Sequence, residues 1–269
     1  MLGVHCLACN LVDKDRNVIT LLAPSVGDGP FGIVIDTAFD GLSVGDPAHA
    51  DADRLVVGDL TVRLDSAAIW EPCPDWPRLR ATRERIALGF RALDTWPSSA
   101  DWGGLAHITG ADQYAAGEPT FMSRLARGNE AYSRLIAEGL GEGKRDSLVE
   151  GTRLLAGLGP GGTPAGDDFL VGVMAAIWLL GDEAVPPIMA DTAAPRTAAV
   201  SAAFLRAAGR GEFIASWHTL LEVLAAGDTD RVEKAAKRVE SFGASSGADA
   251  LHGFILAGRC LLADDTTNQ

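Results

Sequence analysis

The sequence is short of positive charge and of cysteine, and it contains no long apolar run. Its 23 lysines and arginines stand against 36 aspartates and glutamates, so the formal net charge is −13, which argues against binding to nucleic acid or to an anionic membrane surface. Four cysteines in 269 residues are too few for a disulfide framework, so the sequence predicts a protein of the reducing cytoplasm. No apolar stretch reaches the roughly 18 residues of a transmembrane helix, which predicts no membrane span.

Several well-marked catalytic signatures are also missing. The five histidines form no HExxH pair, and there is no GxSxG nucleophile elbow, so zinc protease and serine hydrolase chemistry have no support. Cys6 and Cys9 beside His5 resemble half of a zinc site, but no second pair follows. Two buried thiols are the favoured interpretation of this segment.

Residues 1–75 have the pattern of a small β domain. Short β-branched or alternating runs are separated by turn residues. The first residues lack a basic segment followed by an apolar core, so they predict a strand rather than a signal peptide. Glu71–Pro77 carries three prolines in seven residues, which marks the expected domain boundary. The expected strands are Val4–Val12, Val18–Leu22, Gly32–Asp36, Gly41–Val44, Leu55–Val57 and Leu60–Leu64.

Residues 76–269 have the pattern of a larger α-helical domain, because the apolar period changes from two to about 3.6. The predicted fold class is therefore α+β. Residues 96–119 have weak periodicity and several glycines, which favours a connection over a loop beside a site. The expected helices are Arg78–Asp94, Thr120–Gly139, Lys144–Gly157, Pro164–Leu180, Ala194–Gly209, Phe213–Ala226, Thr229–Phe242 and Gly247–Leu262.

The most informative stretch is residues 157–172, GLGPGGTPAGDDFLVG, which has six glycines and two prolines before an apolar helix. Thr163 followed by Pro164 predicts an N-cap and the first helical residue. Free N–H groups and the positive end of the helix dipole would then face the glycine loop, where they can hold a small anion. The expected anion-binding residues of this stretch are Gly159, Gly161, Gly162, Thr163 and Gly166.

Two adjacent carboxylates, Asp167 and Asp168, complicate this anion site. At about 4 Å they would repel a bound phosphate by several kcal/mol, so a Mg²⁺ ion held by them and by the substrate is one solution. The other interpretation is local, because carboxylates in a first turn are stabilised by the helix dipole and cap free N–H groups. Both interpretations stay open at this point.

A second stretch repeats the end of the first. Both contain G-x-D-x-L-x-G at a constant offset of 81 residues, which pairs Gly166 with Gly247 and Asp168 with Asp249. If the two helices face each other, these aspartates converge on one site, to which Ser245 and Ser246 would add hydroxyls. Alternatively, the glycines serve only close helix packing.

Hydroxyls and arginines between the two repeats are weaker candidates. Thr197 and Ser201 lie one turn apart on a small-residue face and could bind substrate, although such hydroxyls more often bond to the carbonyl four residues earlier. The candidate anion partners Arg153, Arg196 and Arg206 could equally lie on solvated faces. His252, inside the second repeat, is predicted to be a packed neutral histidine.

The run at 157–172 resembles the signature of the AllH family, the AllH-type subunit of oxamate carbamoyltransferase, whose members carry a GLGPGLTPSGDDFLxG-like motif. Segments 197–211 and 243–258 resemble the family in the same order, and the β half matches it loosely. The sequence departs from the family pattern at three positions: Gly162 replaces leucine, Ala165 replaces serine and Ala244 replaces histidine.

The resemblance implies a subunit of a multi-subunit enzyme of allantoin and purine catabolism that transfers a carbamoyl group between phosphate and oxamate. Glycine-loop N–H groups would orient these small anions. Asp167, Asp168 and Asp249 are the expected catalytic residues, with Asp167 and Asp168 as candidate Mg²⁺ ligands. Ser201, Ser245, Ser246 and Gly247 are further expected substrate contacts. The alternatives are a non-catalytic partner or small-anion sensor, and a Mg²⁺-dependent amide or carbamoyl-phosphate hydrolase.

Overall fold

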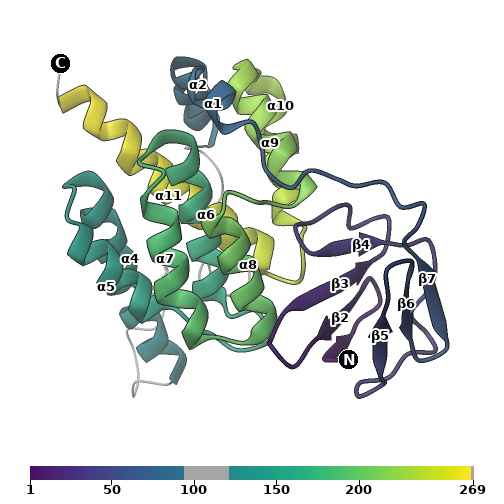
Figure 1. The fold of residues 1–269 in the computed structure, drawn as a ribbon. Coiled ribbons are helices and arrows are strands. Elements are labelled where there is room, and N and C mark those ends of the chain that lie inside the picture. Colours follow the sequence, from purple (N-terminus) through teal and green to yellow (C-terminus); the bar gives the residue numbers. More distant parts are fainter. Residues whose placement is uncertain (94–120, 268–269) are drawn as a thin grey trace. The chain divides into compact units, whose positions relative to one another are not determined.

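The computed structural model describes residues 1–93 and 121–267, which divide into two compact units. The first unit comprises Met1–Pro74 and Phe213–Ala215, and the second comprises Asp75–Glu212 and Ser216–Gln269. A small sheet region precedes a larger helical part (Figure 1). The α+β class expected from the sequence is confirmed. The connection predicted at residues 96–119 lies outside the described residues.

The β-rich unit contains two sheets. In the first, the order is β1-β2-β3-β4, with antiparallel pairs except for the parallel pair of β3 and β4. In the second, β5, β6 and β7 form antiparallel pairs. Because successive side chains of a strand point to opposite faces, Cys9 and Leu11 of the same strand both lie in a core shared with Leu55 and Val57 of the other sheet. The strands are β1 Gly3–Val4, β2 Ala8–Val12, β3 Val18–Leu22, β4 Gly32–Val34, β5 Ala48–Ala50, β6 Arg54–Val57 and β7 Leu60–Arg63.

Three expectations for this unit are corrected. The run Val4–Val12 is two strands, because the chain reverses between β1 and β2. The segment 41–44 is a turn, and the strand beyond it is β5. The thiols are not a buried pair, since Cys9 is fully buried and Cys6 is exposed.

One short segment returns to the β-rich unit from the helical part of the sequence. Phe213 is 2% exposed and donates its backbone N–H to the carbonyl of Pro72 at 2.9 Å. Ala215 donates to the carbonyl of Asp28 at 3.0 Å. A helix was expected from Phe213, but it begins at Ala215 because the preceding residues pair with the first unit.

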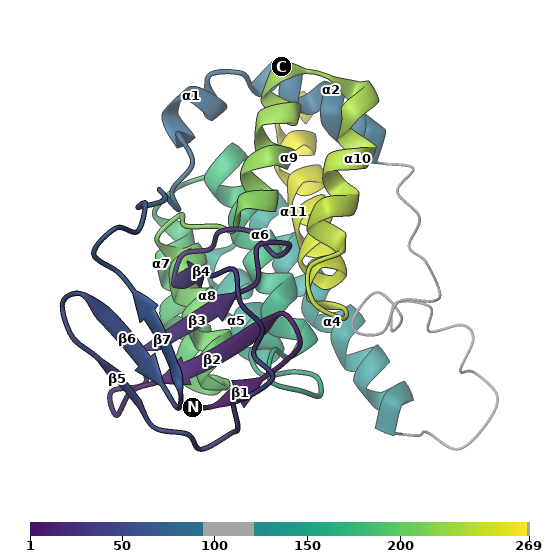
Figure 2. The same ribbon diagram turned by 90° about the vertical axis from the view of Figure 1, so that its right-hand side faces the viewer.

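The helical unit consists of α-helices with one 3₁₀ turn in its described part. Its central helix is α6, which packs against α11 (Figures 1 and 2). All but one of the α6 residues are buried, as expected for a core helix. The helices are α1 Trp76–Arg80, α2 Arg83–Leu93, α4 Phe121–Gly141, α5 Arg145–Leu155, α6 Ala165–Leu180, α7 Val185–Ala193, η2 Ala194–Arg196, α8 Ala199–Gly209, α9 Ala215–Ala226, α10 Thr229–Glu240 and α11 Ser246–Thr267.

Proline position explains two differences from the expected helices. The helix α7 was not predicted from the sequence. Pro186 and Pro187 stand in its first turn, where the missing N–H costs nothing. Pro77 likewise lies in the first turn of α1, whose N-cap Asp75 accepts the N–H of Arg78 at 3.2 Å. A helix therefore begins inside the segment that the sequence marks as the expected domain boundary.

The helix expected over Ala194–Gly209 is interrupted. A 3₁₀ turn ends at Arg196, Thr197 has an extended backbone, and α8 begins only at Ala199. The extended backbone takes Thr197 out of the helix, where its hydroxyl meets a carboxylate of α6.

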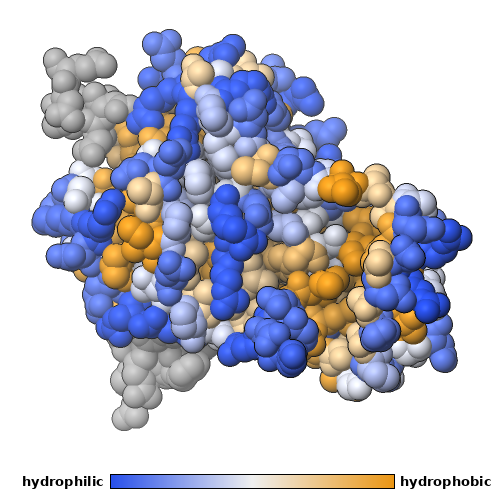
Figure 3. All heavy atoms as spheres, in the orientation of Figure 1, coloured by the Kyte–Doolittle hydropathy of each residue, from blue (hydrophilic) through white to orange (hydrophobic). Residues whose placement is uncertain are grey.

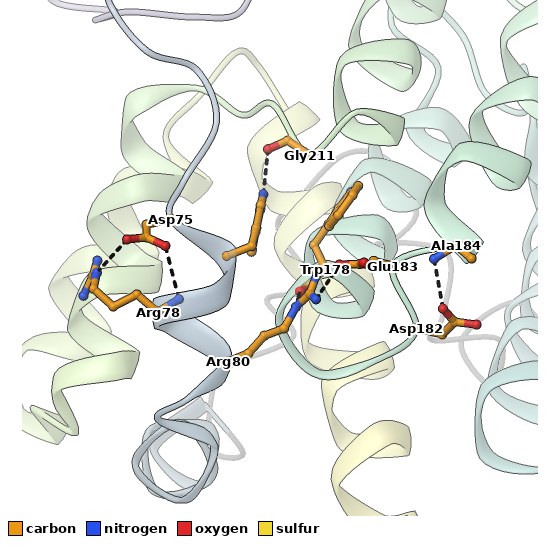
Figure 4. A network of polar contacts seen from close by, with 9 residues as sticks. Asp75, Arg78, Arg80, Trp178, Asp182, Glu183, Ala184 and Gly211 are labelled. Carbon is orange, nitrogen blue, oxygen red and sulfur yellow. Dashed lines mark hydrogen bonds and ion pairs between the residues drawn. The ribbon is translucent and has the colours of Figure 1, made fainter.

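Two arginines cap the C-terminal end of α6. The Arg80 Nε donates to the carbonyl of Trp178 at 2.7 Å, and its guanidinium pairs with Glu183 at 2.6 Å (Figure 4). Arg83 donates to the carbonyl of Leu180 at 2.6 Å. Since α6 has no basic residue in its own last turn, these charges balance the negative end of its dipole. The helix that carries the two adjacent aspartates is thereby fixed at its far end.

Polar and charged side chains spread over the face of the helical unit drawn in Figure 3, with smaller apolar groups between them. Among the described residues, no helix has both the length and the apolar character needed to cross a bilayer.

Candidate functional site

The α6 helix begins one residue later than the sequence predicts. Pro164 is the N-cap, with a ψ of 140° that leaves it outside the helix, and its carbonyl accepts the N–H groups of Asp167 and Asp168 at 2.9 and 3.2 Å. Thr163 is therefore not the N-cap. Its Oγ1 instead lies 3.1 Å from the Oγ of Ser246, in the turn that opens α11.

The loop before α6 combines left-handed glycines with free backbone donors. Gly157, Gly159 and Gly161 have φ values of +73°, +123° and +96°, a region that favours glycine. Gly161 and Gly162 are exposed, and an added Cβ on either would meet nothing within 4 Å. Within the described parts of the chain, no acceptor is bonded to the N–H groups of Gly159, Gly161, Gly162 and Thr163. These four donors lie just ahead of a helix N-terminus, which suits an anion.

Asp167 is a fully engaged buried carboxylate. It is 1% exposed; its Oδ1 accepts the Gly157 N–H at 2.8 Å and its Oδ2 accepts the Ser201 hydroxyl at 2.7 Å. The Thr197 hydroxyl also donates to Oδ2. Asp167 thus ties the start of the glycine loop and the start of α8 to α6. Ser201 donates to this carboxylate and not to the carbonyl four residues earlier.

Asp168 is the unusual ionisable group of the site. It is 7% exposed, and its Oδ2 has no hydrogen-bond partner among the described residues. Burial raises the pKa of Asp168 to about 8; the charges of Asp249 and Asp167 raise it as well, and a hydrogen bond from Ser246 lowers it. At a pKa of about 8 this carboxyl is mostly protonated at neutral pH and changes charge just above it, within the range in which a general acid or base can work.

The second repeat reproduces the backbone pattern of the first. Gly166 donates to the carbonyl of Leu158 at 2.9 Å, and Gly247 donates to that of Phe242 at 2.9 Å. Asp249 donates to the carbonyl of Ser245 at 3.0 Å, as Asp168 does to the equivalent Pro164. The two helix starts are structurally alike, although the first loop is three residues longer.

The structure shows the close helix packing that one interpretation of the repeat expects, and it places the two aspartates near each other. A Cβ on Gly172 would lie 1.7 Å from the carbonyl oxygen of Ala250 in α11, so this glycine permits close helix packing. The charges of Asp168 and Asp249 nevertheless act on each other, and Asp249 is fully buried. The two helices thus bring these carboxyl groups close enough for their charges to interact.

Gly166 and Gly247 have packing roles that the sequence did not reveal. An added Cβ would lie 2.1 Å from the carbonyl oxygen of Leu155 at Gly166, and 2.0 Å from that of Val239 at Gly247. Each glycine therefore lets its helix start pass over the end of the preceding helix. Their expected substrate contacts stay predictions.

The side chains of the other candidates have partners outside the three aspartates. Arg153 pairs with Glu150 at 2.6 Å, the Arg196 guanidinium bonds the carbonyl of Thr192, and Arg206 is exposed. His252 packs its ring 5.9 Å from that of Phe169, and burial and the nearby Arg259 lower its pKa. It is the packed neutral histidine that the sequence predicts.

The carboxylates of this site fit a Mg²⁺ ion poorly. Both oxygens of Asp167 already accept protein donors. Among the described residues, no group of three or more His, Cys, Asp or Glu side chains is placed to hold a metal ion. A Mg²⁺ ion held by Asp167, Asp168 and the substrate stays a prediction, and no step below depends on it.

Family comparisons agree with both halves of the chain. Residues 155–258 match the family model of oxamate carbamoyltransferase subunit AllH, and residues 4–69 match the AllH family N-terminal domain. Together these matches cover more than half of the sequence, including both repeats. No curated protein and no solved structure matches the chain.

Proposed function

The chain belongs to the AllH family, and from this premise we propose that it is a carbamoyltransferase subunit with a site for small anions at the first turns of α6 and α11. The observation that carries the proposal is the position of Asp168, a buried carboxyl whose pKa is raised to about 8 beside a second carboxyl. Free N–H groups of the glycine loop lie immediately before the same helix.

The two parts of the site suit the two needs of carbamoyl transfer. The N–H groups of Gly159, Gly161, Gly162 and Thr163 would bind the phosphate or carboxylate of a small substrate and stabilise negative charge as it develops. Asp168 would exchange a proton with the nitrogen that gains or loses the carbamoyl group. Asp167 would position the loop through its bond to Gly157.

The proposed reaction needs no covalent enzyme intermediate. The amide nitrogen of oxamate attacks the carbamoyl carbon of carbamoyl phosphate, a C–N bond forms, and the bond from that carbon to the phosphate oxygen breaks. Phosphate leaves with the bonding electron pair, and the proton lost by nitrogen ends on the Asp168 carboxylate. The reverse sequence transfers the carbamoyl group from oxalurate to phosphate.

A second candidate is a non-catalytic subunit that binds a small anion and stabilises partner chains. The burial of Asp168 and Asp249 favours it, since at 7% and 0% exposure neither carboxyl is open to a substrate in this chain alone. In that case the glycine loop binds the anion, and another subunit supplies the catalytic groups.

Thermal shifts of the purified chain test ligand binding. Carbamoyl phosphate, oxamate, oxalurate and phosphate are each added with and without Mg²⁺, and a ligand at 100 times its Kd stabilises by about 2.7 kcal/mol. We expect one of these ligands to raise the unfolding temperature of the wild-type chain, and we expect Asp168→Asn to change the size of that rise. Asp191→Asn, which removes an exposed carboxylate of α7, is the matched control and should behave as the wild type.

Turnover in the complex with its partner subunits separates the candidates. A catalytic Asp168 predicts a loss of roughly 10²–10³ in carbamoyl transfer for Asp168→Asn, whereas a binding subunit predicts near-normal transfer at saturating substrate. Phosphate release from carbamoyl phosphate without oxamate would indicate the hydrolase alternative. Absence of any shift, together with normal turnover in the variant, would overturn the proposed site.

A further inference from the structure

The glycine loop before α6 is held at its beginning by the helix that follows it. The N–H of Gly157 donates to the Asp167 carboxylate at 2.8 Å. Two residues later, an added Cβ on Gly159 would lie only 2.9 Å from the backbone nitrogen of Ala165. The first residues of the loop therefore lie directly against the start of α6.

The rest of the loop has a single polar contact. Pro160, Gly161 and Gly162 are exposed, and an added Cβ on either glycine would have open space around it. Among the described residues, the one hydrogen bond made by residues 159–163 joins Thr163 Oγ1 to Ser246 Oγ at 3.1 Å. This bond therefore ties the exposed part of the loop to a second helix, α11.

Ser246 is the fixed end of this bond. The next residue, Gly247, donates to the carbonyl of Phe242 at 2.9 Å, and an added Cβ on it would lie 2.0 Å from the carbonyl oxygen of Val239. The start of α11 is therefore packed against the end of α10. Because α11 also crosses α6 closely at Gly172, the Ser246 hydroxyl has a set position relative to α6, and the loop is the part that can move.

The side chain of Thr163 passes this restraint to the backbone of the loop. A β-branched side chain is stiff at χ1, so a fixed Oγ1 also restricts the backbone of the same residue. The N–H groups of Thr163 and of the preceding Gly162 are two of the free donors of the loop. Donors that are already in place bind an anion without the entropy cost of ordering a loop.

We propose that the hydrogen bond between Thr163 and Ser246 is a latch that holds the glycine loop in its anion-binding conformation. Ser246 is then a positioning residue of the anion site, and it acts through Thr163. A loop that adopts the binding conformation for only a fraction of the time binds its ligand more weakly by that fraction. The inference rests on the proposed function, but the order of the loop can be measured without any ligand, so the two can fail separately.

Nitrogen-15 NMR relaxation of the full chain without ligand measures the order of the loop. The N–H order parameters of Gly161 and Gly162 should be near the rigid value of about 0.85 in the wild type. Thr163→Val and Ser246→Ala each remove one partner of the latch and should lower them below about 0.6. Thr163→Ser retains the hydroxyl and should restore most of the order. Thr61→Val, the same change at an exposed threonine of β7, is the matched control.

Calorimetric titration of the same proteins with inorganic phosphate tests the effect on binding. Thr163→Val and Ser246→Ala should each weaken phosphate affinity roughly fivefold, as expected if the unlatched loop holds the binding conformation about a fifth of the time. The double variant should bind no more weakly than either single variant, because both changes remove the same bond. Thr163→Ser should regain most of the affinity, and Thr61→Val should bind like the wild type.

The outcomes separate a latch from a direct ligand and from an incidental contact. Unchanged order parameters in Thr163→Val and Ser246→Ala overturn the latch, whether or not phosphate binds. Losses of affinity that add in the double variant also overturn it, since Ser246 would then act independently of Thr163. A wild-type chain that binds no phosphate overturns the proposed anion site, and the latch with it. Lower order with weaker, non-additive binding supports the latch, and circular dichroism confirms that each variant is folded.

Discussion

Gly172 of α6 and Gly253 of α11 make reciprocal contacts across the crossing of the two helices. A Cβ on Gly172 would lie 1.7 Å from the carbonyl oxygen of Ala250, and a Cβ on Gly253 would lie 2.1 Å from that of Phe169. Both glycines and both contacted carbonyls are 81 residues apart, so each contact is the counterpart of the other. The repeat in the sequence is thus a local pseudo-two-fold relation, with Asp168 and Asp249 at equivalent positions.

Replacing either crossing glycine should destabilise the protein strongly. Gly172→Ala forces a methyl group into the carbonyl of the facing helix, and we expect a loss of about 3 kcal/mol or more in the free energy of unfolding. Urea unfolding measures it. Gly162→Ala is the control, since nothing lies within 4 Å of its added Cβ. Equal stability of the two variants would contradict the close crossing.

Asp167 should matter for stability more than its hydroxyl partners do individually. Asp167→Asn leaves donors from Gly157 and α8 poorly paired, which should cost about 3 kcal/mol, whereas Ser201→Ala should cost about 1 kcal/mol. Because the two side chains are in contact, the double variant should lose less than the sum. Thermal unfolding provides the comparison, with Ser245→Ala as the control. An Asp167→Asn variant as stable as this control would remove the proposed anchoring role.

The pH dependence of stability should report the proton on Asp168. The folded pKa of about 8 lies above the usual aspartate value of 3.8, so between these pH values the folded state holds a proton that the unfolded state has released. The stabilisation is full below about pH 4 and is lost as the pH rises to about 8, at up to about 1.4 kcal/mol per pH unit.

Asp168→Asn should abolish this contribution, so the variant should gain stability relative to the wild type as the pH rises. Urea unfolding of both proteins at about pH 5 and about pH 8 gives the difference, in which the titration of all other groups cancels to first order. Asp191→Asn should follow the wild type. A constant difference between Asp168→Asn and the wild type across this range would show that Asp168 titrates normally.

Two neighbouring glycines should differ in their effect on anion binding. Gly161 has a φ of +96°, whereas Gly162 has no such left-handed φ, and an added Cβ on either has open space. Alanine at 161 should therefore strain the loop by about 1–2 kcal/mol and weaken anion affinity roughly tenfold. Alanine at 162 should change it little. Titration of both variants with phosphate or carbamoyl phosphate checks this, and equal affinities would place the anion elsewhere.

Local patterns predicted most of the elements. Short β-branched or alternating runs indicated β3, β6 and β7, and the apolar run after the glycine loop indicated the core helix α6, because residue type along the chain marks these segments for burial. The helix α7 was not predicted. Composition alone does not distinguish a proline in the first turn of a helix from a proline that ends one. The break between the 3₁₀ turn and α8 was also not predicted, because it depends on the hydrogen bond of Thr197 to a carboxylate 30 residues away.

The sequence by itself determined that the chain has a β-rich part and a helical part, that a glycine loop opens a buried helix, and that this opening is repeated 81 residues later. These features depend on residue type and spacing along the chain. Only the tertiary structure decided the surroundings of the three aspartates. Asp167 is saturated by donors from the loop and α8, while Asp168 lies buried next to Asp249 with the hydroxyl of Ser246 as its partner. Burial and distant partners set the pKa and the hydrogen bonding of a carboxylate, and both arise from how the helices pack.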